Sequence, residues 1–435
     1  MEQIPFDPAN PRDALSKLPH APAVFALYGA DAHAEPYIGR TPNLRARLER
    51  LLQPSPKHPR RLQLAGRVRR IAYRLTGSDF ESLLAQFTLL EEIYGPKTLD
   101  RMHLGAPAFI RFLGSNAYPR ITVTNRPSQR EADWAYGPFQ SRAAAERFAD
   151  EALKLFLLRR CTDDLDPNPA HPGCVYSEMK MCLAPCYQGC TDQRYAEEST
   201  AVESFLATRG DSRLVVLRTQ RDQASAYLEF ESAAQVHSQI QRIEAVRALA
   251  PELVRPMSHL RAVILQASAH PDEVSVFLYE SGILRGPHPF STIGMRIQNE
   301  QSGSTSLFAQ PLAIEPVPER SEIHDQPSET AQPTAANEPG SAPASEPLAP
   351  AKLPRTILET RLESALTTLA EPHNSPSPTL RQGHLALLKR WYYRPEIRRT
   401  GEIFFPDPES HWPTRQILRG IGRVAAKSLQ ITPPA

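Results

Sequence analysis

Residues 22–48 read PAVFALYGADAHAEPYIGRTPNLRARL, and the expected fold follows from this stretch. The runs VFALYG and PYIGR are short, apolar and separated by turn-forming residues, which predicts two adjacent strands. A helix is predicted next, because leucines recur at helical spacing in NLRARLERLL, at Leu44, Leu48, Leu51 and Leu52. A second helix is expected across FESLLAQFTLLEEIYG. The pattern therefore predicts an α/β (α+β) fold built on a small mixed sheet.

Composition bounds the rest of the chain. Its 435 residues, 41% of them hydrophobic, leave room for several packed domains. The formal charge of +2 is the small difference between 50 basic and 48 acidic side chains, so bulk charge does not indicate a nucleic-acid partner. No apolar run approaches the roughly 20 residues that span a bilayer, and the first residues lack the pattern of a secretory signal. A cytoplasmic protein is expected.

The quoted stretch resembles the GIY-YIG nuclease signature as the UvrC excinuclease family carries it, with Tyr37-Ile38-Gly39 intact. The resemblance implies catalytic positions at Phe25, Tyr37, Arg40 and Arg47, with a Mg²⁺ or Mn²⁺ ion held by a carboxylate of the second helix. A phenol can orient or deprotonate a water, and guanidinium groups stabilise charge on phosphoryl oxygens. The alternative is that YIGR is only a strand end with a turn glycine.

Three family positions carry different residues here. Phe25 lacks the hydroxyl of the first signature tyrosine, Leu51 stands where a further tyrosine is expected, and Gln86 stands at the metal-binding glutamate. A neutral carboxamide is a weak ligand for a hard cation, so magnesium affinity should fall. Glu81 and Glu91 lie five residues to either side of Gln86, which places both away from its helix face.

Arginines make this part of the chain locally basic, as contacts to a phosphate backbone require. DNA binding is expected at Arg40, Arg45 and Arg47, and the wider basic set also contains Arg50, Arg60, Arg61, Arg67, Arg69 and Arg70. The alternative is an ordinary solvated face.

All five cysteines lie between Cys161 and Cys190, in CTDDLDPNPAHPGCVYSEMKMCLAPCYQGC. In a reducing cytosol such a cluster favours a metal site over disulfides. The segment resembles the UvrC region that binds an iron–sulfur cluster, which implies a 4Fe–4S cluster on Cys161, Cys174, Cys182 and Cys186. Spacings of 13, 8 and 4 residues also suit tetrahedral zinc, and unligated thiols are the third alternative. Cys190 has no family counterpart and is expected to be a bystander.

The stretch LEFESAAQVHSQIQRIEAV resembles the UVR motif, the helical hairpin through which UvrC meets UvrB. The resemblance implies partner contacts at Phe230, Ala233, Ala234 and Ile240, whose helical spacing also predicts burial. The alternative is a purely intramolecular helix pair, because His237 and Ser238 replace the usual Arg-Asp pair. A break near Gly210 is expected between two antiparallel helices.

The remainder of the chain completes the expected organisation. UvrC proteins continue into an RNase H-like nuclease, and no such domain is expected here. The sequence HLALLKRWYYRPEIRRTGEIFF resembles the closing segment of UvrC-like proteins with only the first nuclease. Near the end of the chain, a helix-hairpin-helix turn or an ordinary helix start is suggested by Gly420, Ile421, Gly422 and Ala426.

The expected units are a nuclease-like domain (12–100), a connecting segment with the cysteine module (101–195), a UVR-like hairpin (196–250), a small β segment (251–303), a disordered Pro-rich linker (304–354) and a mostly helical C-terminal segment (355–435).

Two main functions follow. The first is a DNA-repair endonuclease making one incision through the GIY-YIG site. The second is a catalytically degenerate DNA-binding or adaptor protein, which the residues at positions 25, 51 and 86 favour. A redox sensor based on the cluster is a third hypothesis.

Overall fold

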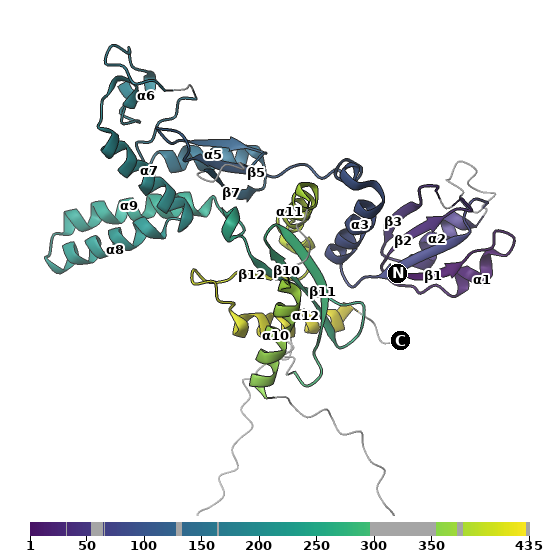
Figure 1. The fold of residues 1–435 in the computed structure, drawn as a ribbon. Coiled ribbons are helices and arrows are strands. Elements are labelled where there is room, and N and C mark those ends of the chain that lie inside the picture. Colours follow the sequence, from purple (N-terminus) through teal and green to yellow (C-terminus); the bar gives the residue numbers. More distant parts are fainter. Residues whose placement is uncertain are drawn as a thin grey trace, which may run out of the picture.

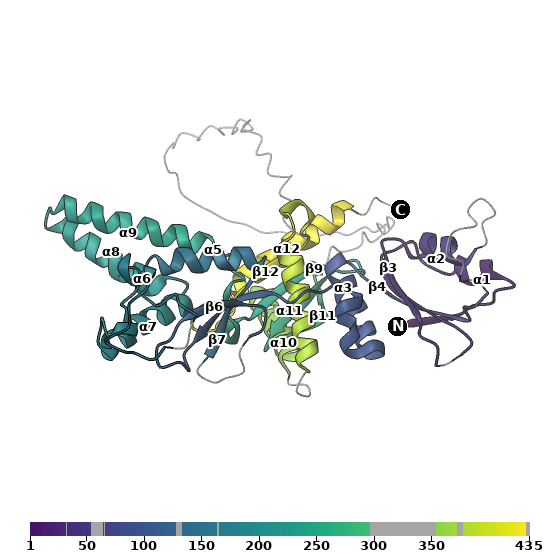
Figure 2. The ribbon, with the colours of Figure 1, turned by 90° about the horizontal axis from the view of Figure 1, so that it is seen from above.

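The computed structural model describes residues 1–31, 33–53, 64, 66–127, 133–162, 165–295, 354–371 and 377–431. The expected linker over residues 304–354 lies almost entirely outside these ranges. Figure 1 shows an elongated arrangement with the N-terminal sheet at one end, a helical hairpin at the other and the C-terminal helices between them, and the view from above in Figure 2 agrees. Within the described residues, no helix is long and apolar enough to cross a membrane.

The first sheet is antiparallel, with strand order β1-β4-β2-β3. The two strands predicted around the YIG motif are β2 (Ala23–Tyr28) and β3 (Tyr37–Thr41), and the outer pair is β1 (Glu2–Pro5) and β4 (Arg70–Leu75). The predicted helices are α2 (Leu44–Leu52) and α3 (Asp79–Tyr94), and a short α1 (Pro11–Ser16) packs with α2. We call this unit the nuclease-like sheet. Helix α3 is followed by the short turns η1 (Gly95–Lys97) and α4 (Thr98–Arg101).

The second sheet has strand order β6-β5-β7-β8 and is covered by α5 (Arg142–Leu153). Its strands are β5 (Ala108–Leu113), β6 (Ile121–Thr124), β7 (Asp133–Phe139) and β8 (Arg255–Pro256). Helix α5 ends at Leu153, eight residues before the first cysteine, Cys161. The cysteines therefore lie in loops that contain only the short turns α6 (Val175–Glu178) and η2 (Pro185–Tyr187).

Three helices follow the cysteines, where two were expected. They are α7 (Asp192–Ala207), α8 (Asp211–Ala226) and α9 (Phe230–Ala248). The predicted break at Gly210 is confirmed, and its φ of 89° is one that glycine adopts readily. A second break, with Leu228 at φ 60°, separates α8 from α9. The antiparallel hairpin is therefore α8–α9, and it projects from one end of the molecule (Figure 1).

The third sheet joins the predicted strands after residue 261 to the C-terminal segment, here residues 354–431. Its order is β11-β10-β9-β12, in which β9 (Ala262–Ala267), β10 (Glu273–Glu280) and β11 (Ile283–Ser291) confirm the predicted strands. The fourth strand, β12 (Glu402–Phe404), pairs with β9. The short turns η3 (Met257–His259) and η5 (Glu396–Arg398) precede β9 and β12. The C-terminal helices are α10 (Arg355–Ala370), α11 (Pro378–Tyr392) and α12 (Thr414–Ile431).

Small antiparallel sheets with covering helices confirm the mixed α and β fold class. The suggested helix-hairpin-helix turn is wrong, because Gly420 and Gly422 both lie inside the uninterrupted helix α12. Gly420 instead permits close packing, since a Cβ there would lie 2.5 Å from the Phe404 ring.

Candidate functional site

The two signature strands meet through an aromatic ring and a glycine. Phe25 on β2 is paired with Gly39 on β3, and a Cβ at position 39 would lie 2.7 Å from the Phe25 ring. The glycine of the YIG motif is therefore needed because the Phe25 ring occupies the space above it. Tyr37 lies on the same face, with its ring centroid 6.2 Å from that of Phe25. The ring of Phe25 is buried in the core of the sheet and offers no polar group to a substrate.

A second tyrosine beside Phe25 was not anticipated from the sequence. Tyr73 on β4 is the register partner of Phe25 on the other side, so the two side chains lie on the same face of the sheet. That phenol donates a hydrogen bond to Glu2. Burial, followed by the hydrogen bond and negative charge of Glu2, raises the pKa of Tyr73 to about 12. The hydroxyl therefore stays protonated at neutral pH and is a poor general base.

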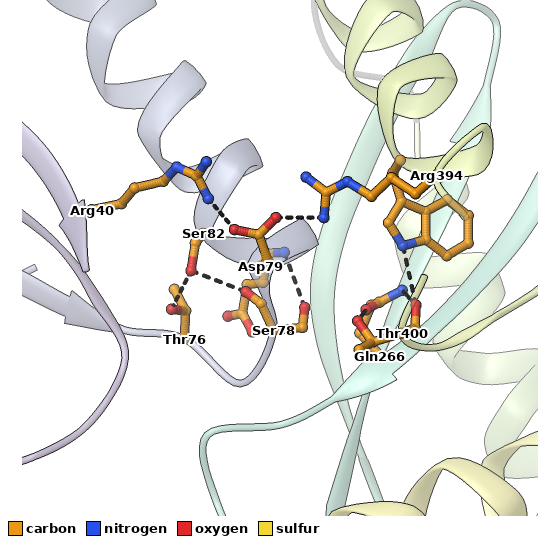
Figure 3. A network of polar contacts seen from close by, with 10 residues as sticks. Arg40, Thr76, Ser78, Asp79, Ser82, Gln266, Arg394 and Thr400 are labelled. Atoms are coloured by element: carbon orange, nitrogen blue, oxygen red, sulfur yellow. Dashed lines mark hydrogen bonds and ion pairs between the residues drawn. The ribbon is translucent and has the colours of Figure 1, made fainter. Parts of the chain in front are cut away.

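Arg40 is held by a carboxylate that the sequence analysis did not single out. Its guanidinium contacts Asp79 in the first turn of α3, and the other oxygen of Asp79 lies 2.5 Å from Nη1 of Arg394 in the C-terminal segment. Figure 3 shows Asp79 between these two arginines. Arg40, the basic residue after the YIG glycine, therefore faces a carboxylate of the same chain, and two cations share that one anion.

Helix α3 starts with well-formed capping, which fixes the direction of Asp79. Ser78 is the N-cap and accepts a hydrogen bond from the Glu81 backbone N–H at 3.1 Å. The Glu81 carboxylate accepts from the Gly77 N–H at 2.9 Å, and burial raises its pKa. Glu81 therefore serves the helix end and does not replace the missing metal ligand.

Gln86 lies on the same face of α3 as Asp79 and Ser82, because positions three and seven residues after Asp79 are neighbours on a helix. The face that carries the family metal position is thus turned the same way as the carboxylate that holds Arg40. A neutral carboxamide at this place does not suit a divalent cation. Leu51 is buried in the core of the nuclease-like sheet and has an apolar packing role there.

The other expected DNA contacts lie on α2. Arg45 is ion-paired with Glu49 at 3.2 Å on the same helix, and Arg47 is half-buried in the middle of α2. Arg60 and Arg61 lie outside the described residues. The basic character of this end of the molecule therefore rests on Arg40, Arg45 and Arg47 together with nearby exposed arginines.

The cysteine loops gather four thiols and leave the fifth aside. Burial, followed by the neighbouring thiols Cys161, Cys174 and Cys186, raises the pKa of Cys182 to about 11, whereas the Ala184 N–H, which donates to its sulfur at 3.3 Å, opposes this shift. The pKa of Cys190 is raised first by burial and then by Asp192, and not by the other thiols. The four cysteines expected as ligands therefore form one electrostatic group.

The donor set suits a positively charged metal centre. Four adjacent thiols cannot all ionise without a compensating cation, and an iron–sulfur cluster or zinc supplies one. Both centres accept ligation by cysteine thiolates alone.

The hairpin residues expected to contact a partner divide into two groups. Ile240 is buried in the middle of α9, and the ion pair between Arg218 and Glu244, at 3.0 Å, also joins α8 to α9. Phe230 is 67% exposed at the tip, beside exposed Tyr227 and Leu228. Its predicted burial is wrong, as is that of Ala234, because the tip of the hairpin extends beyond the core. Ala233 is half-buried.

Comparison with known proteins finds a family model that matches the middle of the chain. Residues 109–205, from β5 through most of α7, match the family model of the UvrC/Cho excinuclease middle domain. This stretch contains β6, β7 and nearly all of β5 from the second sheet, the covering helix α5 and all five cysteines. Residues 109–205 therefore belong to a UvrC-like family.

The relatives are proteins named UvrABC system protein C. That of Alcanivorax borkumensis is 30% identical over 55% of this chain and 39% of its own length. That of Ruminiclostridium cellulolyticum is 29% identical over 68% of this chain and 48% of its own length. The chain thus spans about two fifths to half of the length of these relatives. No solved structure matches the chain.

Proposed function

We propose that this chain is a DNA-binding protein of excision repair whose GIY-YIG site has lost the groups needed for efficient incision. The observation that carries the proposal is the surroundings of three residues at the family's active-site positions. Arg40 is engaged by Asp79, Phe25 is buried without a hydroxyl, and Gln86 stands at the metal position. The basic residues of β3 and α2 remain, so contacts to a phosphate backbone are retained while the chemistry is weakened.

Single incision is the second candidate, favoured by Tyr37, Arg40 and Arg47, which match the family pattern. In either case we propose a 4Fe–4S cluster held by Cys161, Cys174, Cys182 and Cys186. Bound there, the cluster would tie the cysteine loops to one another, and the Ala184 N–H would donate to one of its sulfur ligands.

We also propose that the tip of the hairpin α8–α9 is the surface that meets UvrB. Exposed Tyr227, Leu228 and Phe230 form an apolar patch there, whereas the base of the hairpin is packed within the chain. A partner helix or hairpin could cover this patch.

DNA binding tests the proposal. Fluorescence anisotropy with a labelled duplex should show affinity that falls steeply with salt, because bound phosphates release counterions. The variant Arg47→Ala should weaken binding and reduce the magnitude of the salt slope by about 1. The control Arg361→Ala removes the same charge from an exposed position on α10 and should leave binding unchanged. Binding that is independent of salt would contradict the proposal.

A further inference from the structure

A cleft of about 850 Å³ separates the nuclease-like sheet from the C-terminal segment. One wall is formed by Arg40 and its neighbours on β3 together with the start of α3, and the opposite wall by residues 396–402 and the end of α12. We call it the arginine cleft. It brings together parts of the chain that are more than 300 residues apart in sequence.

The arginine cleft has a surplus of positive charge. Its lining includes Arg40, Arg398, Arg399 and Lys427, against the carboxylates of Asp79, Glu396 and Glu402. Asp79 is already shared by Arg40 and Arg394, and Glu402 accepts two hydrogen bonds from Arg423 at 2.8 and 2.6 Å. Within the described residues Arg398 and Lys427 make no ion pair. The cleft is therefore suited to an anionic ligand.

The wall that carries these cations is rigidly attached. The Thr400 carbonyl accepts hydrogen bonds from Gln266 on β9 and from the Trp391 indole on α11, both at 3.1 Å (Figure 3). At Gly401, φ is 82° and a Cβ would lie 2.2 Å from the Leu265 carbonyl oxygen, so only glycine fits. Arg398 and Arg399 are thus presented by an anchored turn.

An apolar side chain stands among these cations. Ile397 is 100% exposed at the turn η5, next to Arg398, and it lines the arginine cleft. Exposed aliphatic side chains flanked by arginines can contact or wedge between bases while the arginines hold phosphates. This combination favours a nucleic acid, which presents phosphates and an apolar base face together, over a free phosphate or a purely acidic polypeptide.

We propose that the arginine cleft binds a nucleic-acid strand through its phosphodiesters, with Arg398 and Lys427 of the C-terminal segment on one wall, Arg40 on the other, and Ile397 against an unpaired base. This inference rests on the proposed DNA-binding function and deepens it, because it makes the C-terminal segment part of the DNA site.

Anisotropy with two labelled duplexes, one fully paired and one with a short unpaired bubble, tests the proposal. Arg398→Ala combined with Lys427→Ala should weaken binding by roughly tenfold and reduce the magnitude of the salt slope by about 2. The matched control combines Arg361→Ala with Arg415→Ala, two exposed arginines of the same segment that do not line the cleft, and it should bind like the wild type. Ile397→Ala should reduce the preference for the bubble and leave the salt slope unchanged.

A second variant, Asp79→Asn, should change the affinity of the arginine cleft for DNA in the opposite direction. Asp79→Asn removes the anion that Arg40 and Arg394 share, so affinity should rise by roughly threefold to tenfold, as expected for one unit charge a few ångström from a phosphate. Asp100→Asn, on the exposed surface of α4, is the control.

The outcomes separate this inference from the function on which it rests. The cleft proposal would be overturned if the Arg398→Ala, Lys427→Ala double variant and Asp79→Asn both bound DNA like the wild type while Arg47→Ala bound it more weakly. The DNA-binding function would then still stand. If polyglutamate of matched charge or inorganic phosphate displaced the labelled duplex as well as unlabelled DNA does, the cleft would be a general anion site. That result would also overturn the cleft proposal. A wild-type protein without salt-dependent DNA binding would overturn both.

Discussion

At the scale of single residues, the site is determined by which partner each charged or nucleophilic group has. Arg40 is present as the family pattern requires, but Asp79 engages it and Arg394 engages Asp79. Tyr73 lies beside Phe25 but is bonded to Glu2. Residue identity alone therefore overstates how many of these groups are free to meet a substrate.

The cysteines allow a test at this scale. Cys182→Ser should abolish or strongly reduce bound iron and sulfide after anaerobic purification, because the residue belongs to the electrostatic group of four thiols. Cys190→Ser is the matched control and should keep the full content, since its thiol is set apart from that group. Absorption near 400 nm and iron and sulfide assays measure the outcome. Stoichiometric zinc without iron in the wild type would refute the cluster assignment.

At the scale of elements, the contact between α3 and α11 joins the nuclease-like sheet to the C-terminal segment. Gly383 on α11 lies against Phe87 on α3, and a Cβ at Gly383 would lie 2.1 Å from the Phe87 ring. His384, the next residue, is buried and accepts a hydrogen bond from the Leu284 N–H on β11 at 3.0 Å. Three elements are thus fixed around two consecutive residues.

Gly383→Ala should destabilise the protein although alanine is the better helix former. The helix gains about 1 kcal/mol from the replacement of glycine, but the clash with the buried Phe87 ring should cost about 1–3 kcal/mol or more. Gly422→Ala in α12 is the control, because nothing lies within 4 Å of a Cβ there, and it should be neutral or stabilising. Thermal denaturation distinguishes the two variants, and equal melting temperatures would show that the close approach is absent.

His384 makes this contact sensitive to pH. Burial lowers the pKa of His384 from 6.5 to about 4, so the folded protein holds the neutral imidazole whereas the unfolded chain is protonated below pH 6.5. The contribution of neutral His384 to the free energy of unfolding is complete above pH 6.5. It is lost as the pH falls towards 4, at up to about 1.4 kcal/mol per pH unit. Urea denaturation at pH 7.5 and 4.5 should show a smaller difference between wild type and His384→Gln at the lower pH. The exposed His259→Gln should follow the wild type at both pH values. If wild type and His384→Gln differed in stability by the same amount at pH 7.5 and 4.5, protonation of His384 would not be linked to unfolding.

At the scale of the whole molecule, short-range patterns were readable and long-range contacts were not. The strand, turn and helix of residues 22–52 follow from local apolar periodicity, and the four grouped cysteines follow from their spacing and the family resemblance. The pairing of Glu402 with Leu265, and the bridge from Arg40 through Asp79 to Arg394, join segments with no shared local pattern. Only tertiary packing brings these residues together, so no window of sequence could indicate them.

The most direct test of the central claim is a nicking assay on damaged duplex DNA with Mg²⁺ or Mn²⁺. The wild type should make no incision or only a very weak one, and Gln86→Glu should restore part of the activity, because a carboxylate attracts the cation that a neutral amide does not. Restoration should stay partial, since the hydroxyl missing at Phe25 is a contribution commonly worth about 10²-fold. Gln239→Glu, on the exposed side of α9, should behave like the wild type. Strong magnesium-dependent incision by the unmodified protein, abolished by Arg47→Ala, would contradict the account.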